Sequence, residues 1–308
     1  MVVAVIDLGT NTFNLLIAEL LLSKKFKVLH NNKFPVKLGK GGITNNVLLP
    51  DAMQRGVVAL EYCLETIQQY KAEKTVAFAT SAIREAVNAG EFLQMTHKLG
   101  LNVTVVSGDE EAELIFKGVR LALEIGNVPA LIMDIGGGST EFIIADSTKI
   151  YWKQSFLLGV TRLLEKFGPS DPMTDTDLEK LNACLRVELK PLFDAVRLFP
   201  VAELIGSSGS FDSFADILMQ RFHHPEESKT GTEYLFNLKE TELVFRDLLQ
   251  SDRAQRLHIR GLIEMRVDLI VMAVVLTRFV INELGLSKMR LSTYALKEGV
   301  LSQLVKEN

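Results

Sequence analysis

The feature that most constrains the fold is a short pattern that occurs twice in the chain. An apolar run over residues 2–6 leads into DLGT, which begins at Asp7, and then into a second apolar strand. The run over 130–133 leads in the same way into DIGG, which begins at Asp134, and into a returning strand. Apolar runs joined by a turn of small residues are typical of hairpins. A duplication explains the repeat, so we expect two similar halves that face each other.

The rest of the chain alternates between helical and strand periodicity. With 308 residues, of which 47% are hydrophobic, the chain can bury the cores of two ordinary domains. We therefore predict an α/β protein with one domain over 1–124 and a second over 125–291. The predicted strands are 2–6, 13–21, 75–79, 101–106, 130–133, 141–145 and 202–205, and the predicted helices are 51–70, 85–99, 107–124, 174–196, 238–249 and 263–284.

Composition excludes several classes of protein. The formal net charge of −4 and the pI of 5.8 speak against general nucleic-acid binding. Cys63 and Cys184 fall in helical segments among apolar residues, where a buried thiol without a disulfide is expected. The longest apolar stretch, 269–276, is shorter than the roughly 20 residues that cross a bilayer. The N-terminus lacks a basic leader, so we expect a soluble, cytoplasmic protein with neither a nucleic-acid nor a membrane partner.

The two turns have the chemistry of an anion site. Their small residues allow backbone N–H groups to approach an anion closely, and each turn begins with a carboxylate that can hold a hydrated Mg²⁺. No GxxxxGK[ST] motif occurs, and both turns lead into strands, which excludes a P-loop. His223 and His224 are adjacent in a polar loop and do not share a face, so we predict a solvated loop there instead of a metal site.

Six motifs in order resemble the exopolyphosphatase and guanosine pentaphosphate phosphatase family: DLGTNTF, TSAIRE, SGDEEAELIFKGV, DIGGGSTEF, LGVTRLLEKF and GSSGSF. The segments RVD and ALKEGVL near the C-terminus resemble the family as well. The resemblance implies the fold of acetate kinase, sugar kinases, Hsp70 and actin, in which two ribonuclease-H-like domains close over a cleft. It also implies that the C-terminal helix, about 292–308, packs back on the first domain.

The resemblance implies a role for Glu111 as the catalytic base that positions or deprotonates the attacking water. Its neighbour Glu110 is three residues after Ser107, the spacing of a capping box, so Glu110 is expected to reach back to the helix N-terminus. Arg84 resembles the phosphate-contacting arginine of the family, a role that suits the forked guanidinium.

The remaining site residues follow from the same motifs. Asp134 resembles the metal-binding aspartate, with Glu141 and Asp7 as further acidic residues, and the metal is expected to be Mg²⁺, or Mn²⁺ in its place. One phosphate-binding turn comprises Gly136, Gly137, Gly138 and Ser139, its mirror comprises Gly9, Thr10, Asn11 and Thr12, and a possible substrate turn comprises Gly206, Ser207, Ser208 and Gly209.

The sequence departs from the family at two positions and leaves the substrate open. Asn14 replaces the usual Arg or His, and Lys37 replaces the usual Arg. Polyphosphate is the first choice of substrate, because no base-reading pocket is evident, and pppGpp offers the same terminal group. A kinase of the same fold and a non-catalytic polyphosphate sensor are the alternatives from other classes.

The long members of the family continue into a helical C-terminal region that this sequence does not contain. We therefore expect short polyphosphates or nucleotide polyphosphates to be cleaved distributively, aided by a homodimer that extends the cleft. The basic candidates for gripping the polyanion are Lys33, Lys37, Lys40, Arg84 and Arg162.

Overall fold

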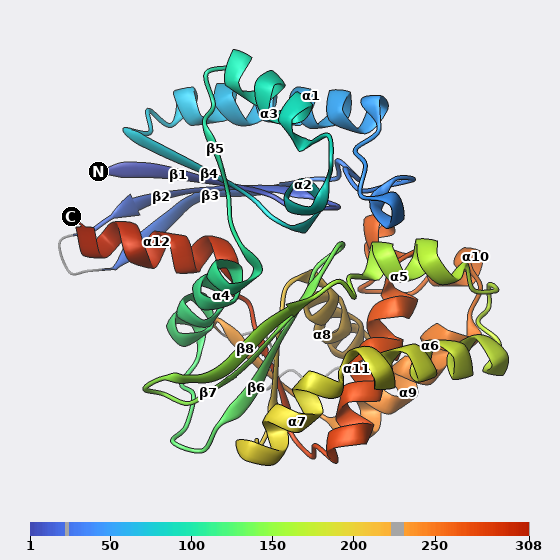
Figure 1. Ribbon diagram of the computed structural model, residues 1–308. Helices are drawn as coiled ribbons and strands as arrows, with labels where there is room; N and C mark the ends of the chain where they lie inside the picture. Colours follow the sequence, from blue (N-terminus) through green and yellow to red (C-terminus); the bar gives the residue numbers. More distant parts are fainter. Residues whose placement is uncertain (22–24, 223–230, 308) are drawn as a thin grey trace.

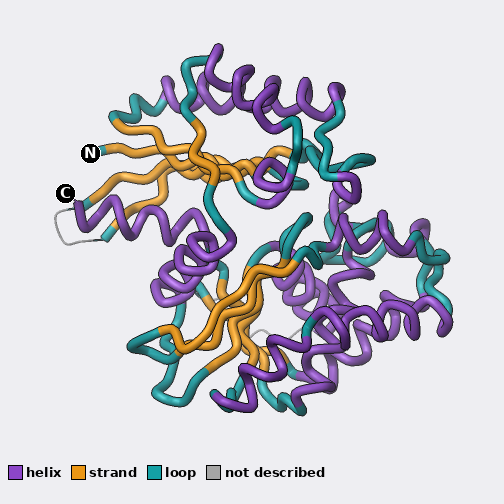
Figure 2. The backbone as a smooth tube through the Cα atoms, in the orientation of Figure 1, coloured by secondary structure: helices purple, strands orange, loops and turns teal. Residues whose placement is uncertain are grey.

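The computed structural model describes residues 1–21, 25–222 and 231–307. Two lobes, each built on its own sheet, lie one above the other in Figure 1, and the tube in Figure 2 shows helices on the outer faces of both sheets. The predicted loop at His223 and His224 lies outside the described residues. In the described part of the chain, no helix is both long and apolar enough to span a membrane.

The first lobe contains a five-stranded sheet in the order β3-β2-β1-β4-β5. The first hairpin strand pairs antiparallel with the second and parallel with β4, and Leu8 pairs with Phe13 at the turn. The strands are β1 (Val2–Leu8), β2 (Phe13–Leu20), β3 (Phe26–Phe34), β4 (Lys74–Ala79) and β5 (Val103–Val105), and the helices are η1 (Ile43–Asn45), α1 (Pro50–Gln69), α2 (Ser81–Glu85) and α3 (Ala89–Lys98).

The second lobe contains a six-stranded sheet in the order β10-β11-β9-β6-β7-β8. Its strands are β6 (Ala130–Ile135), β7 (Thr140–Ala145), β8 (Ile150–Phe156), β9 (Leu204–Ser207), β10 (Glu233–Phe236) and β11 (Met289–Ser292). Its helices are α5 (Val160–Phe167), α6 (Asp175–Glu188), α7 (Lys190–Leu198), α8 (Gly209–Phe222), α9 (Leu238–Gln250), α10 (Arg253–Arg256), η3 (Glu264–Arg266) and α11 (Ile270–Leu284).

The duplication predicted from the two hairpins is confirmed. Read from β8, the second sheet runs β8-β7-β6-β9-β11, which repeats the β3-β2-β1-β4-β5 order of the first sheet and adds β10 at one edge. Ile135 pairs with Thr140 at the second turn, as Leu8 pairs with Phe13 at the first. The protein therefore has the actin-like fold of two related α/β domains.

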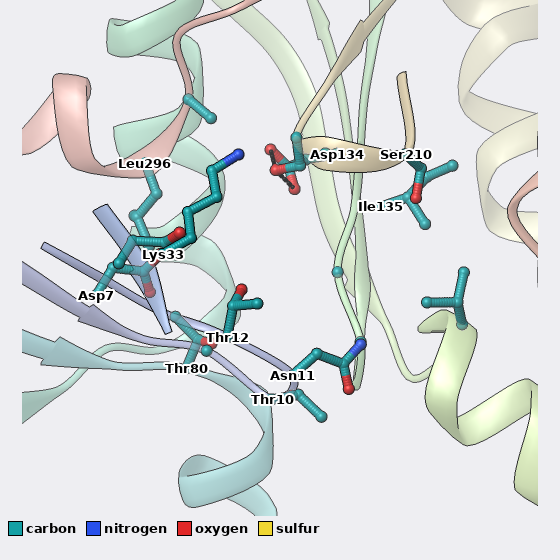
Figure 3. A pocket seen from close by; sticks show the side chains of 18 of the residues that line it. Asp7, Thr10, Asn11, Thr12, Lys33, Thr80, Asp134, Ile135, Ser210 and Leu296 are labelled. Atoms are coloured by element: carbon teal, nitrogen blue, oxygen red, sulfur yellow. Dashed lines mark hydrogen bonds between the residues drawn. The ribbon is translucent and has the colours of Figure 1, made fainter. Parts of the chain in front are cut away.

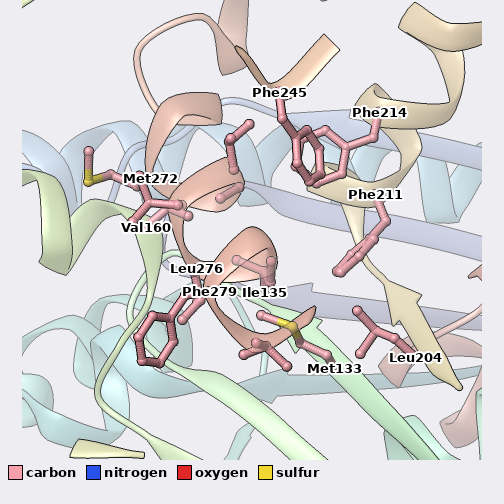
Figure 4. Close-up of a cluster of buried hydrophobic side chains, with 14 of the residues drawn as sticks. Met133, Ile135, Val160, Leu204, Phe211, Phe214, Phe245, Met272, Leu276 and Phe279 are labelled. Atoms are coloured by element: carbon pink, nitrogen blue, oxygen red, sulfur yellow. The ribbon is translucent and has the colours of Figure 1, made fainter. Parts of the chain in front are cut away.

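Aromatic side chains fill the core between the second sheet and its helices. Phe211, Phe214 and Phe245 lie one after another in Figure 4, and the rings of Phe214 and Phe245 have centroids 4.8 Å apart. Helix α11 crosses this core and is apolar almost all round, with ten buried residues. A helix with this pattern is buried on every side, which fixes the lobe around it.

Two helical predictions are wrong in extent. The single helix expected over 174–196 is two helices, because Pro191 in the first turn of α7 lacks the N–H that a continuous helix would use. The helix expected over 263–284 begins only at Ile270, and the residues before it form the short turn η3. The helix expected over 51–70 begins at Pro50, which takes the first helical position, and Leu49 is its N-cap.

Helices α4 (Gly108–Ala122) and α12 (Leu296–Glu307) lie side by side between the two sheets (Figure 1). Their apolar residues share one core with β1 and β2 of the first sheet and with β6 and β7 of the second. The helices approach closely at two glycines. A Cβ on Gly118 would lie 1.9 Å from the carbonyl oxygen of Ala295, and one on Gly299 would lie 1.8 Å from that of Leu114.

We expect Gly299→Ala to lower the free energy of unfolding by about 1–3 kcal/mol, because the added methyl group overpacks the contact between α4 and α12. Gly90→Ala is the matched control, since nothing lies within 4 Å of a Cβ at this helical position. The control should leave stability unchanged or raise it by up to about 1 kcal/mol. Urea denaturation of both variants measures the difference, and equal stabilities would show that the two helices are not in close contact.

Candidate functional site

A cleft of about 340 Å³ opens between the two lobes, and both hairpin turns line it. In Figure 3, Asp7 and Asp134 lie on opposite sides of this space. Four of the predicted residues are not in its lining: Arg84, Glu141, Gly206 and Ser207. The predicted residues that line it are Asp7, Gly9, Thr10, Asn11, Thr12, Glu111, Asp134, Gly136, Gly137, Gly138, Ser139, Ser208 and Gly209.

The two turns touch at one end of the cleft. A Cβ on Gly137 would lie 2.5 Å from Nδ2 of Asn11, and a Cβ on Gly138 would lie 2.8 Å from Oγ1 of Thr10. Real Cβ atoms do not approach other atoms this closely, so a larger residue at either position would force the facing side chains to shift. The small residues that suggested an anion site thus also allow the lobes to close on each other.

Helix α5 fixes the orientation of the second turn from behind. The backbone N–H of Val160 donates to Gly136 O at 3.0 Å, and that of Thr161 donates to Gly137 O at 2.9 Å. Because C=O and N–H point in opposite directions across a planar trans peptide, the N–H groups of Gly137 and Gly138 point away from α5. In the described part of the chain, these N–H groups have no hydrogen-bond partner, so they are free to bind an anion.

The first turn is held in the same way by a loop. Gly39 N donates to Thr10 O at 3.0 Å, and Lys37 N donates to Asn11 O at 2.8 Å. The N–H groups of Asn11 and Thr12 therefore point away from this loop, and no hydrogen bond between described residues uses them. The two turns are also closed alike, by Gly9 N to Thr12 O at 3.1 Å and by Gly136 N to Ser139 O at 3.0 Å.

The predicted base Glu111 lies in the first turn of α4 and is 7% exposed. The predicted capping box is confirmed, because Glu110 and Ser107 bond reciprocally and leave Glu111 to face the cleft. Nη1 of Arg84 donates to Oε2 of Glu111 at 2.7 Å. Burial, and then the charge of Glu141, raise the pKa of Glu111, whereas Arg84 works in the opposite direction.

Arg84 therefore contacts the predicted base, and its contact with phosphate stays a prediction. Its Nε also donates to Glu85 at 3.0 Å, and its side chain is only 15% exposed. The signal TSAIRE located the residue correctly near the site. The motif could not show that the guanidinium of Arg84 donates to Glu111, which lies 27 positions later in the chain.

Asp134 and Asp7, one in each lobe, both accept hydrogen bonds from neutral donors. Both oxygens of Asp134 accept hydrogen bonds from the hydroxyl groups of Ser207 and Ser208, at 2.6 to 2.8 Å. Burial raises the pKa of Asp134 despite these bonds. Asp7 accepts from Nδ2 of Asn14 at 2.9 Å, and burial raises the pKa of Asp7 to about 6. Asn14, which replaces an expected basic residue, is thus a neutral hydrogen-bond donor to the Asp7 carboxylate.

Glu141 is buried behind the turn. Its Oε1 accepts from Ser139 at 2.6 Å and from Ser155 at 2.7 Å. Burial, and then the charge of Asp134, raise the pKa of Glu141 to about 7. Asp7 and Asp134 both line the cleft, so they are suited to supply one or two carboxylate ligands to Mg²⁺. A cation there would stabilise the ionised forms of both carboxylates, whose pKa values are raised. No described group of three or more such residues forms an all-protein metal cage.

The structure adds three residues to the predicted site, which are Ser81, Arg266 and Lys297. Ser81 is 1% exposed, lines the cleft, and its hydroxyl has no partner among the described residues. Lys33, Arg266 and Lys297 supply positive charge to the lining; of these, only Lys33 was a sequence candidate. Ser81 lies inside TSAIRE, Arg266 inside RVD and Lys297 inside ALKEGVL, so those motifs held the missing signal. Of the basic candidates for gripping the polyanion, Lys37, Lys40, Arg84 and Arg162 do not line the cleft.

Comparison with known proteins finds one family model and several similar structures. A family model described as the Ppx/GppA phosphatase family matches residues 17–308. An exopolyphosphatase from Cytophaga hutchinsonii is 36% identical with a TM-score of 0.95, and the match covers 100% of this chain and 98% of that chain. The PPX-GPPA enzyme of Aquifex aeolicus is 24% identical with a TM-score of 0.80, over 98% of this chain and 99% of that chain. An exopolyphosphatase-like protein has a TM-score of 0.87 at 24% identity, with 99% and 98% covered.

We expect Glu141→Gln to raise the free energy of unfolding at pH 8 by about 1–3 kcal/mol. The folded pKa of Glu141, about 7, exceeds its ordinary value of 4.5, so the folded state loses stability as pH rises from 4.5 through 7. The gain of the variant should therefore fade below pH 5. Urea denaturation at pH 8 and pH 5 measures both differences.

Glu203→Gln is the control with the opposite sign. Burial works against ionisation of Glu203, but Arg290 and Lys288 lower its pKa on balance. Neutralising this side chain should cost stability at pH 8. A Glu141→Gln variant that is no more stable than the wild type at pH 8 would show that the buried carboxylate carries no penalty.

Proposed function

The chain belongs to the Ppx/GppA phosphatase family and is a phosphatase, and we propose that it hydrolyses the terminal phosphoryl group of inorganic polyphosphate. The observation that carries this proposal is the pair of opposed turns whose free N–H groups share one cleft with the buried carboxylate of Glu111. Phosphoryl transfer requires placement of a nucleophile and neutralisation of charge more than covalent chemistry. The cleft offers donors for the phosphate and a carboxylate for the water.

In this mechanism, the terminal phosphoryl group accepts hydrogen bonds from the N–H groups of both turns. Glu111 orients a water molecule for in-line attack, and the water oxygen bonds to phosphorus as the bond to the bridging oxygen breaks. The proton of the water passes to Glu111, whose raised pKa makes it a better acceptor near neutral pH. The bridging oxygen leaves on the shortened chain, and orthophosphate is released.

Asp134 and Asp7 are the residues that would hold Mg²⁺, or Mn²⁺ in its place. Glu141, buried behind the turn, would add negative charge close to the same ion. The ion would supply neutralisation of charge on the phosphate oxygens. Lys297 adds further positive charge to the cleft. Its charge lowers the pKa of both Asp7 and Asp134, whereas burial, the larger influence, raises both pKa values. Arg84 keeps Glu111 in place through the hydrogen bond of 2.7 Å.

The second candidate substrate is pppGpp, which presents the same terminal group. The cleft continues to Ser208 and Gly209, where α8 begins, and this segment was predicted to touch a substrate. Gly206 and Ser207 lie in β9 and do not line the cleft, so only half of the predicted turn is available to a ligand. Polyphosphate stays the first proposal for this reason. A homodimer that extends the cleft stays a prediction.

The direct test is phosphate release from polyphosphate, pppGpp and ATP, measured side by side with Mg²⁺ and after chelation. We expect release from polyphosphate or pppGpp that falls when the metal is removed. Transfer from ATP to an acceptor without hydrolysis would favour the kinase alternative. Binding of polyphosphate without release would favour the sensor.

We expect Glu111→Gln to lower kcat by about 10²–10⁴-fold, because an amide cannot take the proton of the water. Glu110→Gln is the matched control on the adjacent position. Its amide oxygen can still accept from the N–H of Ser107, so the cap persists and activity should stay within about threefold. Steady-state kinetics on the best substrate separate the two variants, and similar rates for both would refute the assignment of Glu111.

A further inference from the structure

Arg162 is a buried cation on the far side of the second turn. The residue is 8% exposed and belongs to the first turn of α5. Its Nε donates to Gly138 O at 3.1 Å, and its Nη1 donates to Ile43 O at 2.7 Å and to Oδ1 of Asn46 at 3.2 Å. Nη2 is buried and has no partner among the described residues. All three oxygens that it contacts are neutral.

These contacts join the two lobes. Gly138 belongs to the second lobe, whereas Ile43 and Asn46 belong to the segment around η1 of the first. Two further contacts of α5 cross the same boundary. The hydroxyl of Thr161 donates to Oδ1 of Asn11 at 2.6 Å, and Gly41 N donates to Glu165 at 2.6 Å. Helix α5 is therefore docked on the first lobe beside the point where the turns touch.

The bond to Gly138 also sets the direction of one more peptide. With its C=O held toward Arg162, the following N–H, that of Ser139, points away from the arginine. Together with the bonds from Val160 and Thr161, this bond makes the N–H groups of Gly137, Gly138 and Ser139 all point away from α5. Three aligned N–H groups make an anion-binding concavity. The third of them depends on a side chain that both lobes hold.

Among the described residues, no carboxylate bonds directly to the guanidinium of Arg162. Burial lowers the pKa of Arg162, with Glu85 and Glu165 acting against this from a distance, and a guanidinium stays protonated in proteins. A buried charge without a bonded counter-ion is costly. An anion on the other face of the turn would be stabilised by this charge, because electrostatic interactions are strong where water is excluded.

We propose that Arg162 is a positioning residue that couples closure of the two lobes to the orientation of the Gly136–Ser139 turn and attracts the terminal phosphate through that turn. The inference rests on the proposed function, since it requires a phosphate in the cleft. It predicts that Ile43 and Asn46 of the first lobe change the affinity for phosphate although neither residue touches the phosphate.

Asn46→Asp tests the electrostatic part. The change is nearly isosteric and supplies Arg162 with a carboxylate at the position of Oδ1, 3.2 Å from Nη1. Asn46 has a φ of 53°, a left-handed conformation that aspartate also adopts. We expect thermal stability to be kept or raised, while pyrophosphate binds about tenfold more weakly by calorimetry, a loss that corresponds to about 1.4 kcal/mol. Unchanged or tighter binding would overturn the electrostatic role.

Arg162→Met tests the positioning part, with Arg256→Met as the matched control. Arg256 is also buried, at 4% exposed, and its Nε also donates to a carbonyl, Val267 O at 3.0 Å, but it is ion-paired with Asp171 and does not line the cleft. Both variants should lose stability. Only Arg162→Met should lower kcat/KM, on the order of tenfold or more, as displaced catalytic geometry does.

The outcomes separate the two proposals. If the wild type neither binds pyrophosphate nor releases phosphate, the proposed function fails and this inference falls with it. If the wild type does both, and Arg162→Met loses no more activity than Arg256→Met at matched stability, this inference alone is overturned. Arg162→Lys keeps the charge but loses the forked guanidinium. If it restores pyrophosphate affinity but not kcat, the charge attracts the phosphate and the guanidinium geometry positions the turn, as proposed.

Discussion

The site depends on hydrogen bonds that reach the two turns from behind. Residues of α5 donate to the carbonyls of Gly136, Gly137 and Gly138 in the second turn, and the loop over 37–39 donates to those of Thr10 and Asn11 in the first. A carbonyl that faced the cleft would repel a phosphate, whereas an N–H attracts it. Different elements perform the same task in the two lobes, a helix N-terminus in one and a loop in the other. The duplicated fold therefore conserves the orientation of the turn more closely than the element that holds it.

The charges of the cleft are arranged at a cost to stability. Asp7, Asp134, Glu111 and Glu141 all have raised pKa values, chiefly because of burial. Natural proteins accept such groups where chemistry requires them, which makes clustered shifts a mark of a functional site. The serine and asparagine donors reduce the penalty without neutralising it. A cation and a bound polyanion are the partners that these residues suit.

The sequence predicted the features that depend on neighbouring residues. The two hairpins, the duplication and the capping box of Ser107 and Glu110 follow from local spacing, and the structure confirms them. Features that depend on the approach of distant segments were missed. The pairing of Arg84 with Glu111 and the position of Lys297 arise only when the chain folds. Arg162 was expected in the cleft because it is basic and near the turn, but its helix directs it to the opposite face.

The helix boundaries failed where one residue overrode a periodic pattern. Pro191 divides a helix that apolar spacing alone would continue, and Pro50 begins a helix one position before its predicted start. The segment before Ile270 is apolar enough to read as helix, yet it forms a short turn that brings Arg266 to the cleft. Tertiary contacts decided this segment.

The central claim is that backbone amides of the turns hold the phosphate. Amide NMR of the Glu111→Gln variant, titrated with pyrophosphate, tests it most directly. The account predicts downfield shifts of the amide protons of Gly137, Gly138 and Ser139 that saturate with binding, while Gly90 on α3 stays unchanged. Saturable binding that leaves all three turn amides unshifted would contradict it.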